Sequence, residues 1–202
     1  MKITREQVAE NRRRILDSAS RLFRSRGVDA VSVADVMQGA GLTHGAFYRH
    51  FASKDDLVAE ALAHILTSDG DAPFSLRGYL EQYLSAEHRD NPAEGCPFAA
   101  LASEIRHQSP QARAVMTAGA RQIIEMMSID MPASADTAER QTAIGNWAAM
   151  VGAMMIARAV DDGALSDRIL DETRRFVESS IKPVASADPE TGVLEAPSPP
   201  NG

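Results

Sequence analysis

Residues 32–57 read SVADVMQGAGLTHGAFYRHFASKDDL, and this stretch decides the fold. Ser32, with an acidic residue three positions later, has the spacing of a capping box and predicts the start of a short helix. The glycines of Gly39-Ala-Gly41 predict its end within two turns. Thr43 is placed to cap a second short helix that runs through Phe51. Two short helices joined by a glycine-containing turn are the pattern of a helix-turn-helix.

The outer side of this unit predicts a surface that reads DNA. In a helix-turn-helix, the second helix enters the major groove and the first crosses the phosphate backbone. Phe47 and Phe51 are four residues apart, so they share the face that packs inward. Gly45 is small, which lets the backbone approach DNA closely. The hydroxyl of Tyr48 and the ammonium of Lys54 are groups that bind phosphate.

A family resemblance extends over residues 15–57. Together with ILDSASRLF at 15–23 and with Gly27, the stretch closely resembles the DNA-binding domain of tetracycline-repressor-like (TetR-like) regulators. Its most specific part is Phe-Tyr-x-His-Phe-x-x-Lys-x-x-Leu, which begins at Phe47. The resemblance implies an all-helical homodimer, with an N-terminal three-helix helix-turn-helix domain and a C-terminal helical domain that binds a small molecule and dimerises. It also implies a transcriptional regulator, usually a repressor, that binds a double-stranded DNA operator.

Carried over position by position, the resemblance assigns DNA contacts to residues in and beside this unit. Tyr48, His50 and Lys54 match positions that contact phosphate, and the run 43–45 matches positions that meet base edges or backbone. The structural alternatives are a surface aromatic at Tyr48 and a helix-packing residue at His50. The candidate DNA contacts are Ser32, Val33, Thr43, His44, Gly45, Tyr48, Arg49, His50 and Lys54.

Charge is unevenly distributed along the chain. The 202 residues carry a formal net charge of −7, which taken alone argues against a nucleic-acid binder. Residues 1–55 hold ten Lys and Arg against six Asp and Glu, a net of +4, so the remaining 147 residues carry −11. A basic end on an acidic chain indicates a nucleic-acid surface at that end, while an arginine-rich solvated helix face would give the same count.

The pattern before Pro183 is helical throughout, with no sustained alternation of apolar and polar residues, so the predicted fold class is all-α. We expect about nine helices. They cover about 5–26, 33–39, 43–51, 53–66, 74–87, 97–107, 111–127, 137–160 and 166–181, with a polar loop at 88–95. The predicted domains are a helix-turn-helix domain at 1–52, a ligand-binding and dimerisation domain at 53–182, and a proline-rich disordered tail at 183–202.

The expected helix at 137–160 carries a seam of small residues, which permits close helix packing. The resemblance places the dimer interface on this helix and the final one. The candidate interface residues are Gly145, Ala149, Gly152, Ala153, Ala157, Ile169 and Phe176. The alternative is that the seam packs within one subunit.

The C-terminal half is rich in methionine, a side chain that adapts to irregular shapes, which favours a plastic apolar pocket for an effector. The alternative is that methionines at helical spacing form ordinary core. The candidate pocket residues are Tyr83, Cys96, Phe98, Leu101, Met116, Ile123, Met127, Trp147, Met150, Val151 and Met154.

Cys96 supports a second functional hypothesis, that of a thiol sensor. The run from Gly95 to Glu104 resembles the start of the sixth helix in a subgroup of these regulators, in which some relatives with a cysteine there respond to electrophiles or oxidants. A helix N-terminus lowers the pKa of a thiol, while neighbouring Glu94 opposes thiolate formation. The alternatives to a ligand-responsive repressor are therefore a thiol-sensing repressor based on Cys96 and a helical interaction module that has lost DNA binding. An inert, packed thiol is the structural alternative.

The sequence contains no pattern typical of an enzyme, a metal site or a cofactor site. The five histidines have no spacing typical of a zinc site, and no nucleophile elbow, phosphate loop or dinucleotide motif is present. We therefore predict no enzyme activity, no metal and no cofactor. A single cysteine, the lack of a long apolar run and the lack of a signal peptide predict a cytoplasmic protein without a membrane partner.

Overall fold

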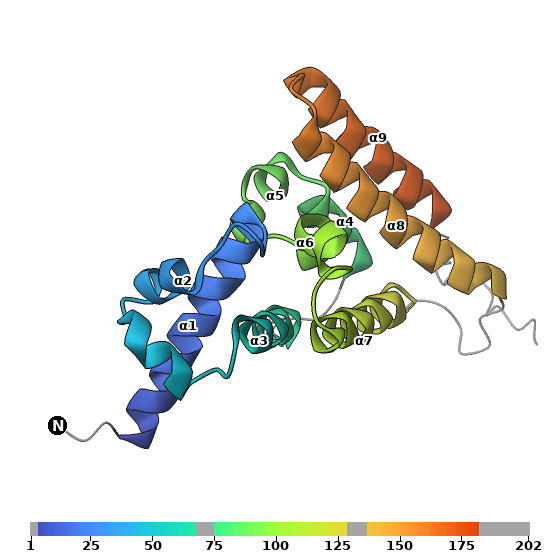
Figure 1. Cartoon of the computed structure of the whole chain (residues 1–202). Helices are drawn as coiled ribbons and strands as arrows, with labels where there is room; N and C mark the ends of the chain where they lie inside the picture. Colours follow the sequence, from blue (N-terminus) through green and yellow to red (C-terminus); the bar gives the residue numbers. More distant parts are fainter. Residues whose placement is uncertain (1–3, 68–74, 129–136, 182–202) are drawn as a thin grey trace, which may run out of the picture.

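The computed structural model describes residues 4–67, 75–128 and 137–181 (Figure 1). Within these ranges the chain forms nine α-helices and two short 3-10 helices, and no strand. They are α1 (Arg5–Arg26), α2 (Val33–Gly39), η1 (His44–Arg49), α3 (Lys54–Thr67), α4 (Leu76–Tyr83), α5 (Ala86–Asp90), η2 (Pro92–Glu94), α6 (Pro97–Ile105), α7 (Pro110–Met127), α8 (Thr137–Ala159) and α9 (Gly163–Ser180). The all-α prediction is confirmed, and the predicted tail lies outside the described residues.

Two local predictions need correction. The second helix of the helix-turn-helix is a 3-10 helix, and the side chain of Thr43 makes no capping hydrogen bond to it. The predicted helix at 74–87 breaks at Leu84, because Ser85 accepts a hydrogen bond from the His88 amide at 3.1 Å and starts α5. Pro92 then occupies the first turn of η2, so the predicted polar loop contains the end of α5 and the whole of η2.

The N-terminal core is built on one face of α1. Ile15, Ala19 and Phe23 are fully buried there, at the helical spacing that places them on one side. Phe47 and Phe51 close the core from the other side, with ring centroids 5.7 Å apart. Their inward direction is the predicted one, and burial of each aromatic ring contributes about 1.5–3 kcal/mol.

Polar side chains of α1 also fix the position of α2. The Ser18 hydroxyl donates to the Val36 carbonyl at 2.9 Å, and Arg14 donates to the Ala40 carbonyl at 2.5 Å. Ser32 forms the predicted capping box with Asp35, in which each residue's side chain accepts from the other's backbone amide. These bonds satisfy backbone groups at both ends of α2, so the short helix is held rigidly on α1.

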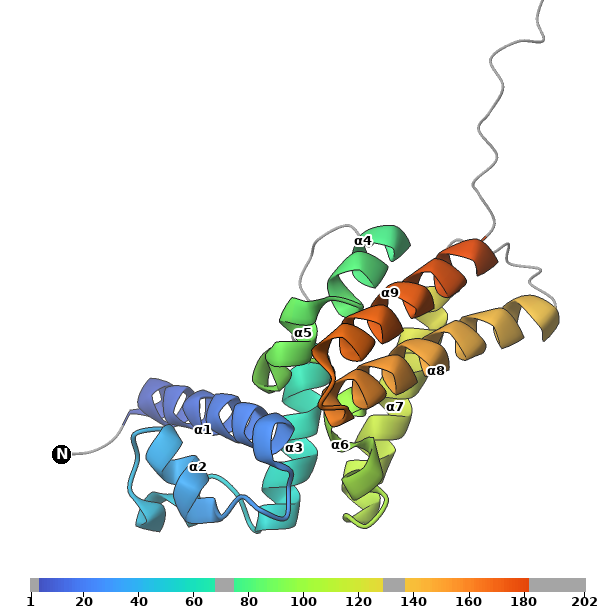
Figure 2. The ribbon, with the colours of Figure 1, turned by 90° about the horizontal axis from the view of Figure 1, so that it is seen from above.

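The remaining helices form a second body. α3 packs against both α1 and α7, and α6 lies between α1 and α8. α8 and α9 lie side by side at the edge farthest from α2 and η1 (Figures 1 and 2). Among the helices of the described ranges, none is long and apolar enough to cross a membrane.

Candidate functional site

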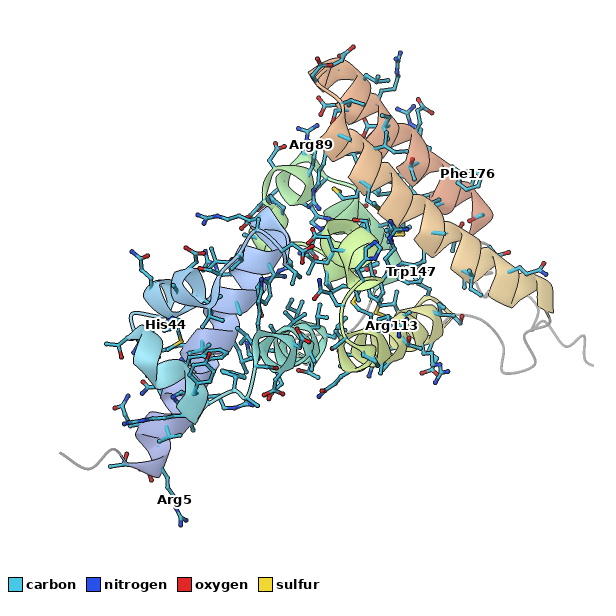
Figure 3. All side chains as sticks on the ribbon, in the orientation of Figure 1. Arg5, His44, Arg89, Arg113, Trp147 and Phe176 are labelled. Carbon is cyan, nitrogen blue, oxygen red and sulfur yellow. The ribbon has the colours of Figure 1, made fainter. Side chains whose placement is uncertain are left out.

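The outer face of η1 is polar and open to solvent. Tyr48 is 72% exposed, whereas the adjoining Phe47 is 1% exposed and packs edge-on against the Tyr48 ring at 5.2 Å. A Cβ added at Gly45 would meet no atom within 4 Å, so the backbone there is accessible to a large partner. Thr43, His44 and Arg49 are exposed on the same unit. Figure 3 shows His44 at the outer side of the N-terminal domain, away from the C-terminal helices.

The other predicted DNA contacts already have intramolecular roles. The Ser32 side chain belongs to the capping box, although the residue is exposed, and Val33 is half-buried and packs on the core. The half-buried Lys54 donates from Nζ to the Val28 carbonyl at 2.7 Å. An ammonium group has three donors, so this bond leaves Lys54 two donors for a phosphate.

His50 lies at the rim of the core. Its Nδ1 atom is buried without a hydrogen-bond partner among the described residues. Burial lowers the pKa of His50, and the nearby Arg12 and Arg49 lower it further. A DNA contact by this residue would therefore come from a neutral imidazole, which donates a hydrogen bond but brings no charge.

The loop after α1 joins the two bodies. Gly27 has φ +85° and lies under the Glu104 side chain, where an added Cβ would stand 2.5 Å from Oε1. The Glu104 carboxylate, from α6, accepts a hydrogen bond from the Val28 amide at 2.7 Å. Because Lys54 holds the Val28 carbonyl, this one peptide segment is fixed by α6 on one side and by α3 on the other. Sequence reasoning missed Glu104, since no local pattern marks a contact over 76 positions.

The predicted pocket residues form core in this structure. Phe98, Leu101 and Met116 belong to the cluster shared with the N-terminal domain, and Tyr83, Met127, Met150 and Met154 belong to a second cluster under α8. Cys96, Ile123, Trp147 and Val151 pack against both clusters. An open cleft of about 750 Å³ lies between α1 and α2, and another of about 430 Å³ lies where α5, α8 and α9 meet. Neither is lined by the predicted residues.

A buried polar junction lies beside these clusters and centres on His88. Its Nδ1 donates to the Tyr83 carbonyl at 2.7 Å, and its Nε2 accepts from the Cys96 amide at 3.0 Å. Arg158 donates to the carbonyls of His88 at 2.7 Å and Arg89 at 3.0 Å. Arg24, from α1, reaches the Gly95 carbonyl at 2.8 Å. Tyr83 and Cys96 are among the predicted site residues. The three basic residues, Arg24, His88 and Arg158, were not predicted because they lie in three separate elements.

We expect the stability of the fold to decrease below about pH 6.5 because of His88. Burial holds the pKa of His88 below its ordinary value of 6.5, with Arg158 and Arg24 adding to the shift and the Tyr83 carbonyl opposing it. As the pH falls, the unfolded chain therefore binds this proton before the folded chain does. The contribution is complete above the unfolded pKa and is lost as the pH falls toward the folded pKa.

Urea unfolding at about pH 7.5 and about pH 5.5 measures this effect. His88→Gln keeps an acceptor for the Cys96 amide and does not titrate, so it should flatten the pH dependence by up to about 1.4 kcal/mol per pH unit. His107→Gln, at an exposed position, should keep the wild-type dependence. An unchanged slope in His88→Gln would show that another group titrates.

An apolar face is exposed along α8 and α9. Ile156 and Phe176 are 53% and 60% exposed, and Ile144 and Met155 are also exposed. A Cβ at Gly145 or Gly152 would meet no atom within 4 Å, and Ala149 and Ile169 are half-buried. Figure 3 shows Phe176 on the outer side of α9 and Trp147 on the inner side of α8.

Two predicted interface residues lie elsewhere. Ala153 and Ala157 are buried in the cluster that packs within the subunit, and the Ala157 carbonyl accepts from the Ser166 hydroxyl at 2.7 Å. The small-residue seam therefore serves two faces: one side packs inside the protomer, and the side with Gly145 and Gly152 is open.

Two family models match consecutive parts of the chain. The model for bacterial regulatory proteins of the tetR family matches residues 15–61, and the model for the tetracyclin repressor-like C-terminal domain matches residues 74–173.

Individual relatives match part of the chain. The chain is 34% identical over 113 residues to the HTH-type transcriptional repressor KstR2 of Mycobacterium tuberculosis, and the match covers 52% of this chain and 49% of that protein. It is 44% identical over 57 residues to the HTH-type transcriptional regulator AcrR of Shigella flexneri. This match covers 28% of this chain and 26% of that protein. The chain thus spans about half the length of the first relative and about a quarter of the second.

Solved structures are similar over most of the chain. A TetR-family transcriptional regulator from Agrobacterium tumefaciens is 25% identical, with a TM-score of 0.68 over 85% of this chain and 98% of that one. The reduced form of NemR from E. coli shares the fold, with 21% identity and a TM-score of 0.67 over 84% of this chain and 95% of that one. With matching models for both domains, the chain belongs to the tetR family of bacterial regulatory proteins.

Proposed function

We propose that the protein is a homodimeric, ligand-responsive transcriptional repressor, which binds a palindromic DNA operator and is released by a small-molecule effector. It acts in the cytoplasm and catalyses no reaction. The observation that carries the proposal is the outer face of η1, where Gly45 and Tyr48 are exposed directly above the buried Phe47. A rigid core under an open polar face is the arrangement that a recognition helix needs.

The exposed face of α8 and α9 supports the dimer. Exposed apolar patches on a soluble protein mark interaction sites, and this one lies at the far edge from η1. In a two-fold symmetric pairing through that edge the two η1 units are related by the symmetry axis, which matches the symmetry of a palindromic operator.

Release by an effector requires that the two bodies move together. Glu104 and Lys54 fix the Val28 peptide from opposite sides, so a displacement of α6 is transmitted to the loop before α2 and to the start of α3. An effector shifts the balance between the two arrangements only by its difference in affinity for them.

Substitutions on the open face of η1 test DNA binding without touching the core. Gly45→Leu adds a side chain that meets no protein atom near its Cβ, and it should weaken operator binding at least about tenfold by blocking close approach. Tyr48→Ala removes one hydroxyl donor to phosphate and should weaken binding by about tenfold. Fluorescence anisotropy with a DNA fragment selected from the source genome measures both.

The matched control for the glycine substitution is Gly78→Leu, which is exposed on α4, where an added Cβ makes only ordinary contacts. It should bind DNA as the wild type does. Wild-type affinity should fall linearly with salt on a log–log scale, and Tyr48→Ala should keep the slope because it removes no charge. Undiminished binding by both η1 variants would refute the assignment and favour an interaction module that does not use this face for DNA.

A further inference from the structure

The buried junction around His88 contains more hydrogen-bond donors than acceptors. Tyr83 is 4% exposed, and its hydroxyl has no hydrogen-bond partner among the described residues. The Nη1 atom of Arg158 is also buried without a partner. Burial raises the pKa of the Tyr83 hydroxyl, and the neighbouring Cys96 side chain raises it further. Buried donors of this kind are rare, and each indicates a missing acceptor.

The two unpaired donors belong to residues that both contact His88. The Tyr83 ring packs edge-on against the His88 ring, with centroids 4.7 Å apart, and Arg158 binds the His88 carbonyl. A Cβ added at Gly95 would stand 2.6 Å from His88 Nε2 and 3.0 Å from Arg158 Nη2, so these groups surround the same backbone. The Tyr83 ring and the Arg158 guanidinium therefore both lie against His88.

The charge around His88 is positive. Arg158 donates to two backbone carbonyls and forms no ion pair among the described residues, and burial lowers the pKa of its guanidinium. Arg24 approaches the same backbone at the Gly95 carbonyl. Glu94 stands 3.9 Å from Arg24 but is exposed, and Asp90 is engaged with Arg89. His88 is neutral, because its Nε2 accepts a hydrogen bond. An unpaired buried cation is costly, so the chemistry of the site favours an anion.

We propose that Tyr83 Oη and Arg158 Nη1 bind the carboxylate of an elongated apolar effector. This rests on the proposed function, of which it specifies the effector class. A carboxylate accepts both hydrogen bonds and neutralises the guanidinium. The apolar body lies along α8, because Met154 and Met150 follow Arg158 at intervals of four residues and are fully buried. Trp147 lies about 16 Å from Arg158 by the helical rise and packs against the apolar cluster that this body enters. Methionine side chains rearrange to admit it.

Octanoate and 1-octanol are the probes, because they share an alkyl chain and differ in the charged group. Trp147 is the single tryptophan of the chain, so its fluorescence reports binding at this cluster in the full-length protein without DNA. We expect octanoate to bind at least about tenfold more tightly than 1-octanol. In Arg158→Gln the two probes should bind with about equal affinity. Tyr83→Phe keeps the packed ring and should reduce the ratio of the two affinities by about threefold or more. Arg113→Gln, at an exposed position on α7, should keep it.

Equal affinity for the two probes, or no binding of octanoate, would overturn the proposal and assign the unpaired donors to a buried water. Formate and chloride distinguish a free ion from an effector: if they alone reproduce the octanoate response, the site takes an ion and not an apolar carboxylate. Because DNA is absent, a negative result here leaves the operator experiments standing. Loss of DNA binding would not alter the ratio of the two affinities.

Discussion

Ile156→Asp is expected to convert the protein to a monomer and to weaken operator binding by about 100-fold or more. Ile156 is 53% exposed on α8, beside the open backbone at Gly152. In a symmetric interface the two copies of this residue lie on the same shared surface, so the substitution removes apolar burial and adds two carboxylates to a desolvated contact. Each monomer then binds one half-site and loses the gain that the second half-site gives.

Sedimentation velocity and anisotropy titration measure the two effects on the same preparation. Ala114→Asp is the matched control, because it places the same charge at an exposed position of a different helix, α7. It should remain a dimer with wild-type affinity. A dimeric Ile156→Asp variant would contradict the assignment of the α8–α9 face, and a monomer with full affinity would contradict binding as a two-fold pair.

Glu104→Ala is expected to destabilise the folded protein by about 1–3 kcal/mol. It removes the acceptor of the Val28 amide, which belongs to a fully buried residue, and leaves that donor unsatisfied. It also disconnects α6 from the loop that starts the helix-turn-helix, so operator affinity should fall in parallel. The isosteric Glu104→Gln keeps an acceptor oxygen and should lose less stability.

Urea unfolding measures the stability loss, and Ser103→Ala, an exposed neighbour on α6, is the control. Gly27→Ala provides a second route to the same contact. It introduces a Cβ at φ +85° close to the Glu104 carboxylate, and the backbone strain alone costs about 1–2 kcal/mol. Wild-type stability in both Glu104→Ala and Gly27→Ala would show that this junction does not hold the two bodies together.

Local patterns predicted the helix-turn-helix well because the forces that form it act over a few residues. The capping box at Ser32 and the inward face shared by Phe47 and Phe51 depend on spacings of three and four positions. The 3-10 form of η1 was not predictable, because no local pattern in residues 44–49 distinguishes it from an α-helix and the segment packs on α2. The polar stretch before Cys96 also hid two short helices, since its composition is typical of a loop.

Contacts between distant segments were beyond sequence reasoning. No pattern links Glu104 to the Val28 amide, or Arg158 to the His88 carbonyl, because the fold alone brings these groups together. The same limit affected Ala153 and Ala157. Their spacing along α8 matches that of an interface, but only the position of α9 decides which small residues face inward.

The net charge of the chain is informative about DNA binding only when residues 1–55 are counted separately from the rest. The net of +4 over residues 1–55 includes the exposed Arg49 beside the outer face of η1, while the rest of the chain carries a net of −11. Such an asymmetry of charge favours one orientation of the protein on DNA more than raw affinity.

Selection of genomic DNA fragments by the purified protein tests DNA reading through η1 most directly. The wild-type protein should enrich fragments that share an inverted repeat, with half-sites about one turn of DNA apart, roughly 34 Å, or at a variant of that spacing. Gly45→Leu should enrich none of them, while Gly78→Leu should enrich the same set. Fragments without a shared inverted repeat, or equal enrichment by Gly45→Leu, would contradict DNA reading by a symmetric pair of η1 units.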